Sequence, residues 1–188
     1  MDALMAAFVA ALLAQASDRT PWLTAILSTR FARPGTIIVA TAIALAAGNG
    51  VAAIGGMMIG PHMPPNARDL FLALALLSAG GSALFPIKPP DRLSGWRIGA
   101  FMTSLLGVAI LAAGDRSQFI TLAISARSPS PVLAAVGATI GALVINIPAI
   151  LAGEAARKTL PLTAIRLTIG VLFLITGIIL GLGAIRLI

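Results

Sequence analysis

Two short polar motifs carry the residues in this chain whose types and spacing could do chemistry. The first reads Gln-Ala-Ser-Asp-Arg-Thr over residues 15–20, and the second reads Ala-Ala-Gly-Asp-Arg-Ser over residues 112–117. Each lies within a run of otherwise apolar residues, so each places a carboxylate and a guanidinium where a charge is costly. Acids in such surroundings are typical of ion binding or proton transfer.

The oxygen atoms near these motifs would suit a hard divalent cation such as Ca²⁺ or Mn²⁺. Gln15 and Asp18 are three residues apart and therefore share one helix face, whereas Arg19 points about 100° away from Asp18. Six or more oxygens around two negative charges could then surround one ion. The candidate ligands are Asp18, Asp115, Gln15, Thr20, Ser117, Gln118, Asn49 and Asn146.

The composition indicates a membrane protein. Of 188 residues, 59% are hydrophobic and only 10% are charged, and the mean hydropathy is +1.02. The chain has no cysteine, which excludes disulfides, thiolate metal sites and cysteine nucleophiles. The net charge of +7 comes from basic residues that stand singly between apolar spans, so it does not predict nucleic-acid binding.

The positioning elements are expected to be six transmembrane helices in a single all-α domain over residues 1–188, at about 20 apolar residues per span. Pro21 and Gly114 predict an interruption in the two helices that contain the motifs, because proline lacks an N–H and glycine loosens a helix. The expected spans are approximately residues 2–30, 35–59, 68–87, 96–127, 131–153 and 161–185.

A constant offset of 97 residues relates the two halves of the sequence and indicates an internal duplication. It aligns not only the motifs but also Pro34 with Pro131 and Asn49 with Asn146. The expected repeats are about 1–88 and about 96–188. Because each would have three spans, the second would cross the membrane in the opposite sense, which makes the repeats inverted.

The basic residues predict an orientation. One side is expected to hold Arg30, Arg33, Lys88, Arg92, Arg97, Arg157, Lys158 and Arg166, and the other only Arg68, Arg127 and Arg186. The positive-inside rule then makes the first side cytoplasmic and places both termini outside the cytoplasm. The expected location is a bacterial inner membrane.

The two motifs resemble the doubled E-x-G-D-[KR]-[ST] signature of the GDT family of manganese and calcium transporters. The likeness extends to Leu-Ser-Thr-Arg at 27–30, Gly-Ala-Thr-Ile-Gly at 137–141 and Gly-Val-Leu-Phe-Leu at 170–174. It implies export of a divalent cation, Mn²⁺ ahead of Ca²⁺, in exchange for protons, with the motif acids as ligands. The chain departs from the signature at Gln15 and Ala112, which stand where the family has glutamate, and at Ser17, which stands for glycine.

A second reading of the same residues stays open. Asp18 and Asp115 could each pair with an arginine and only hold helices together, and the asparagines could be interhelical hydrogen-bond donors. The protein would then be a non-transporting or partner-dependent scaffold. The glycine pairs 56 and 60, 137 and 141, and 177 and 181 predict close helix packing. No catalytic motif or cofactor is expected. The expected partners are the lipid bilayer, a divalent cation and protons, and the sequence leaves a homo-oligomer open.

Overall fold

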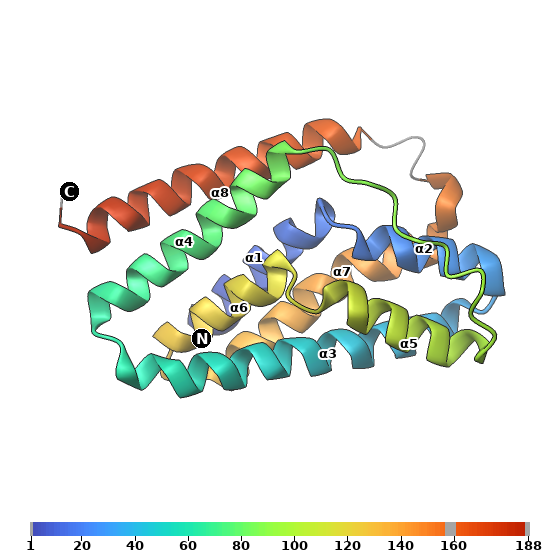
Figure 1. Ribbon diagram of the computed structural model, residues 1–188, viewed down its shortest axis with the longest axis horizontal. Helices are drawn as coiled ribbons and strands as arrows, with labels where there is room; N and C mark the ends of the chain where they lie inside the picture. Colours follow the sequence, from blue (N-terminus) through green and yellow to red (C-terminus); the bar gives the residue numbers. More distant parts are fainter. Residues whose placement is uncertain (1, 157–160, 187–188) are drawn as a thin grey trace.

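The computed structural model describes residues 2–156 and 161–186, and over these residues the chain is helical, without strands (Figure 1). This confirms the all-α prediction. In chain order, the helices are α1 (Asp2–Ala16), α2 (Thr20–Phe31), α3 (Pro34–Ile59), the short 3₁₀ helix η1 (Gly60–His62), α4 (Pro65–Leu84), α5 (Gly99–Ala112), α6 (Arg116–Arg127), α7 (Pro131–Ala156) and α8 (Leu162–Ala184).

Four of these helices are long and apolar enough to cross a membrane, namely α3, α4, α7 and α8. The pair α5 and α6 passes the same test only when taken together, as one span bent by 65°. Within the described residues the structure therefore supports four or five spans. Helix α1 is apolar but has only 15 residues, so it is too short to span alone, and the sixth span stays a prediction.

Both helices that were expected around the motifs are broken at the motifs. Residues 17–19 separate α1 from α2, and residues 113–115 separate α5 from α6. Pro21 lies in the first turn of α2, where the N–H group that proline lacks would have no partner within the helix. Gly114 has a positive φ of 73°, a conformation that glycine adopts readily. The expectation of an interruption is confirmed, and among the described residues each half of the chain has four α-helices.

The helices pack in equivalent pairs when the offset of 97 residues is applied. Helices α1 and α2 lie on α7, their counterparts α5 and α6 lie on α3, and α4 runs along α8 (Figure 1). The predicted glycine contacts are confirmed. A Cβ added at Gly141 would lie 2.3 Å from the carbonyl oxygen of Phe8, and one added at Gly60 would lie 2.4 Å from that of Ala126. Small residues thus allow close backbone approach.

The connection between the halves, residues 85–98, crosses one end of the molecule. Arg30, at the end of α2, donates to the backbone carbonyls of four residues of this connection, Arg92, Leu93, Ser94 and Trp96. Arg92 also forms an ion pair of 2.7 Å with Glu154 of α7. The predicted basic side corresponds to this end in Figure 1, although Arg157 and Lys158 lie outside the described residues. Both termini lie at the opposite end.

Candidate functional site

The two helix breaks bring polar backbone and side-chain groups to the middle of the molecule. At the first break, the N–H groups of Ser17 and Asp18 donate to carbonyls three residues earlier, which closes α1 with a tight turn. Asp115 precedes α6 at the second break and has an extended backbone. Each acid therefore lies at the start of a short helix, where the helix dipole favours a negative charge.

Asp18 is held by groups from both halves of the chain. Its Oδ2 accepts a hydrogen bond of 2.9 Å from the hydroxyl of Thr20. Its Oδ1 lies 3.5 Å from Nη2 of Arg116, which also donates to the carbonyl of Ser17 at 2.7 Å. The side chains of Asp18 and Arg116 are only 8% and 12% exposed. This is a largely buried ion pair, so removing one partner would leave the other charge uncompensated.

Asp115 is placed differently from Asp18 although the repeat makes them equivalent. Its Oδ2 is buried and has no hydrogen-bond partner among the described residues, and the same holds for Nη1 of Arg116. Asp115, Asp18 and Arg116 line the same cavity. The arrangement brings the two predicted acids together and leaves one carboxylate oxygen available for a further ligand.

Gln15 and Asn146 form one continuous hydrogen-bonded group. Asn146 donates through Nδ2 to Oε1 of Gln15 at 3.1 Å and to the carbonyl of Ala142 at 2.9 Å, and its Oδ1 accepts from Thr24 at 3.3 Å. The side chains of Gln15 and Asn146 are at most 1% exposed. These two predicted ligands therefore bind each other in the structure and support the wall of the site.

Asn49 and Gln118 make their contacts at helix α3, away from the group formed by Gln15 and Asn146. Asn49 donates to the hydroxyl of Thr139 at 3.1 Å, which is an interhelical bond between α3 and α7. Gln118 accepts from the N–H of Gly114 at 3.3 Å, and its amide lies against Gly48 of α3. Neither contacts an acid through a hydrogen bond in the described structure. Ser117 is 3% exposed and Thr20 is fully buried, so both face the interior.

Among the described residues, cavities with volumes of about 450, 310 and 260 Å³ include motif residues in their linings. The largest, of about 450 Å³, is lined by Asp18 and Asp115 together with Arg19, the end of α4 and residues 85–87. A second, of about 260 Å³, extends from Asp18 to Arg166 at the start of α8, and a third, of about 310 Å³, lies between α2, α7 and α8. Their linings lead toward the end of the molecule where the 85–98 connection runs.

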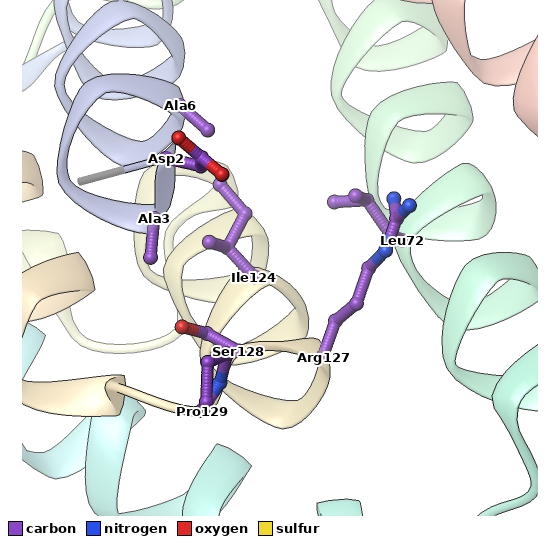
Figure 2. A pocket seen from close by; sticks show the side chains of 8 residues that line it. All are labelled: Asp2, Ala3, Ala6, Leu72, Ile124, Arg127, Ser128 and Pro129. Carbon is purple, nitrogen blue, oxygen red and sulfur yellow. The ribbon is translucent and has the colours of Figure 1, made fainter.

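The opposite end has a vestibule that does not reach the motifs. It has a volume of about 390 Å³ and lies between α1, α4 and α6, and its lining includes Asp2, Leu72, Ile124 and Arg127 (Figure 2). None of its lining residues belongs to either motif. Arg127 forms an ion pair of 2.9 Å with Asp69 and so joins α6 to α4.

The described residues around the motifs provide few anionic ligands for a cation. Within the described residues, no group of three or more His, Cys, Asp or Glu side chains could hold a metal ion. The cavity of about 450 Å³ is lined by two carboxylates, from Asp18 and Asp115, and by the competing guanidinium of Arg116, and the hydroxyl of Thr20 donates to Asp18. Such a site would bind a divalent ion weakly and reversibly, because affinity rises with the number of anionic ligands.

Three residues around the acids were absent from the predicted ligand set. Arg116 pairs with the acid of the other half, which only the fold reveals. Thr24 donates a hydrogen bond to Asn146. The sequence contained one indication of its importance, because Thr24 aligns with Thr121 at the offset of 97 residues. Arg166 lines the same cavity as Asp18, and nothing in the sequence relates the two positions.

Comparisons with known proteins agree with the motif resemblance. The family model described as "Divalent cation/proton antiporter GDT1" matches residues 3–90 and 100–186. A protein from Vibrio cholerae serotype O1, named "Putative manganese exporter", is 28% identical over 179 residues, which cover 95% of this chain and 90% of that protein. No solved structure matches the chain.

Proposed function

The chain belongs to the divalent cation/proton antiporter GDT1 family, and on this premise we propose that it exports Mn²⁺, with Ca²⁺ as a second substrate, in exchange for protons. The protein is thus a multi-pass membrane transporter of divalent cations and not an enzyme. The name of the Vibrio cholerae relative supports manganese as the ion. The observation that carries the proposal is that Asp18 and Asp115, one from each half of the chain, line a single cavity at the two helix breaks.

The proposed architecture is six transmembrane spans arranged as two inverted repeats within one domain. The broken pair α1 and α2 would be the first span, as its counterpart α5 and α6 is the fourth. Two observations support the repeats, over about 1–88 and about 96–188. The family model matches two separate segments, and α1 and α2 run in the opposite direction to α5 and α6 in Figure 1. Sites between such repeats are typical of secondary transporters.

In the proposed mechanism, the cation binds between the two carboxylates, and Arg116 moves away from Asp18 as the ion arrives. Thr20 and Ser117 would contribute hydroxyl oxygens, and Gln15 and Gln118 amide oxygens. Asn49 and Asn146 would complete the set or orient these amides. When the cation leaves, a buried carboxylate without a counter-ion is unfavourable, so protonation of the acids would complete the exchange.

The proposed orientation follows from the basic residues. The end that carries Arg30, Arg92 and the 85–98 connection would face the cytoplasm of a bacterial cell, and both termini would lie outside it. Residues 85–87 of the connection and the first residues of α8 line the cavities at the motifs, which supports access from the basic end. An exporter must load its ion from the cytoplasm, so the described conformation would be the loading state.

A scaffold without transport is the second candidate, and one contact favours it. The ion pair between Arg116 and Asp18 neutralises the acid without any cation, as a purely structural charge pair would. In that case the motifs would only fix the packing of the two halves. The two candidates differ in whether the acids are needed for ion movement.

Transport into proteoliposomes tests the proposal. Purified protein would be reconstituted with a Mn²⁺-sensitive dye inside the vesicles and a proton gradient across the membrane. We expect Mn²⁺ flux that depends on the gradient and that is lost in Asp18→Asn. Asp91→Asn is the matched control, because Asp91 is exposed on the connection and its one hydrogen bond, from Leu93 N–H, can also be accepted by asparagine. No flux from the unaltered protein, or equal flux in both variants, would favour the scaffold.

A further inference from the structure

We infer that Arg19 and Arg116 are exchangeable counter-ions of the two acids. In the described conformation Arg116 binds Asp18, and in the opposite conformation Arg19 binds Asp115. The two arginines would therefore act as positioning residues that decide which face of the protein is open. This inference rests on the proposed function only in taking the chain to alternate between two conformations.

The first observation is that the two motifs, although equivalent in sequence, form different ion pairs. Arg116 contacts Asp18 and the Ser17 carbonyl, and its side chain is 12% exposed. Arg19 occupies the same motif position 97 residues earlier, yet it is exposed and no acid pairs with it in the described parts of the chain. Asp115 meanwhile has a buried carboxylate oxygen without a hydrogen-bond donor. Among the described residues, Asp115 therefore forms no ion pair with an arginine of the other half, and Arg19 forms none with an acid.

The second observation is that the surrounding helices show the same inequality. Helix α4 packs along α6, with the rings of Phe71 and Phe119 edge to face at 5.4 Å and the ion pair of Asp69 with Arg127 beyond them. The equivalent pair, α8 and α2, is not packed in this way. Cavities of about 310 and 260 Å³ lie between the first turns of α8 and residues of α2 or its preceding break.

The unequal ion pairing of the two arginines and the unequal packing of α4 with α6 and of α8 with α2 have one common explanation. Two halves with the same fold can exchange their conformations, which is the basis of alternating access in inverted repeats. After the exchange, α8 would close on α2, α4 would separate from α6, and the site would open toward the termini. The same exchange would move Arg116 off Asp18 and bring Arg19 to Asp115. Each arginine would thus stabilise one conformation and not the other.

The exchange cannot be fully symmetric, and the sequence shows where it differs. Applying the offset of 97 to Asp69 and Arg127 gives Arg166 and Arg30, which are both cations and cannot form the equivalent ion pair. Arg30 instead binds carbonyls of the 85–98 connection. The described conformation therefore has an ion pair that its opposite lacks, and it should predominate when no cation is bound.

Distances measured in the membrane without added cation test the inference. The chain has no native cysteine, so spin labels can be attached at Asn66 and Ser130 to report on α4 and α6, and separately at Arg33 and Thr163 for the equivalent positions at the basic end. All four residues are exposed. Pulsed electron paramagnetic resonance then gives the populations of the short and long distances in lipid nanodiscs.

We expect Arg116→Gln and Arg19→Gln to shift these populations in opposite directions. Arg116→Gln should lengthen the Asn66 to Ser130 distance and shorten the Arg33 to Thr163 distance, with a change in population ratio of about tenfold, as for the loss of a hydrogen bond to a charged group. Arg19→Gln should enrich the described conformation.

A merely structural role would not produce changes of opposite sign. The variants Arg116→Lys and Arg19→Lys keep the charge and should restore the distances of the unaltered protein. Shifts in the same direction, or no shift in either glutamine variant, would overturn the inference. If Arg116→Gln does not fold, Arg19→Gln alone still decides, because its side chain makes no ion pair in the described conformation. The measurement needs no transport, so its failure is distinct from failure of the proposed function.

Discussion

Replacing Gln15 by glutamate should strengthen divalent cation binding, because it adds a carboxylate at the end of α1, three residues before Asp18. Contrary to expectation, the two residues do not share a helix face, because α1 ends at Ala16 and Asp18 lies in the break. The replacement nearly preserves the shape of the side chain. Its oxygen can still accept the hydrogen bond from Asn146 Nδ2, which is 3.1 Å long in the structure. Gln15 is 1% exposed, so the new charge will be buried and will require a counter-ion. The cation itself can supply that charge.

The size of the effect follows from distance and burial. The turn that ends α1 keeps Gln15 and Asp18 close, since the N–H of Asp18 donates to the carbonyl of Gln15 at 3.1 Å. At a separation of about 6 Å and an effective dielectric constant of about 20, a carboxylate attracts a divalent ion by about 5 kcal/mol. Burial of the new carboxylate offsets several kcal/mol of this attraction. A net gain of about 1.4 to 2.8 kcal/mol remains, which is a decrease in Kd of about 10- to 100-fold.

The assay is calorimetric titration of purified protein with Mn²⁺ in detergent, at fixed pH and ionic strength. Gln15→Met is the matched control, since it has a similar volume and removes the polar group without adding charge. We expect tighter binding only for Gln15→Glu, together with a larger thermal stabilisation by Mn²⁺. If glutamate and methionine at this position bind Mn²⁺ equally well, the first motif does not line the cation site and the reasoning fails.

Three further predictions concern helix packing, the site wall and orientation. Gly141→Leu should lower the yield of folded protein by several-fold in size-exclusion chromatography, because the facing α1 backbone leaves no room even for a Cβ. Gly48→Ala should reduce transport by about tenfold in the proteoliposome assay while insertion persists, since the added Cβ would displace the Gln118 amide, and unchanged transport would remove Gln118 from the site. In intact cells, an impermeant thiol reagent should label a cysteine at Asn66 but not one at Arg92, and the reverse pattern would invert the proposed orientation.

Much of the fold could be predicted because the signals are local or repeated. Apolar runs bounded by prolines predicted α3 and α7 to within a few residues, and Pro21 and Gly114 predicted the helix breaks. The glycine pairs predicted the close helix contacts, because a missing side chain is visible in the sequence whatever lies opposite. The extent of α4 was less accurate. It begins at Pro65 and ends at Leu84, since the chain leaves the helix to form the extended connection.

The pairing within the site could not be predicted, because it depends on which half supplies each partner. Sequence spacing relates Asp18 to Arg19 but does not indicate that Arg116, 98 residues later, binds this acid. The repeat also suggested equal environments for Gln15 and Ala112. In the structure the space around these two residues differs. Gln15 already fills its buried space, whereas Ala112 is 2% exposed, so a glutamate there would overpack the core at a cost of about 1 to 3 kcal/mol.

The number of cations bound by one chain tests the central claim, which is that Asp18 and Asp115 bind the same ion between the two halves. Equilibrium dialysis of the purified protein with radioactive Mn²⁺ gives this number directly. We expect one ion per chain, with binding lost in Asp18→Asn and equally in Asp115→Asn, and retained in Asp91→Asn. Two independent ions per chain, or full binding in either of the first two variants, would contradict a shared site.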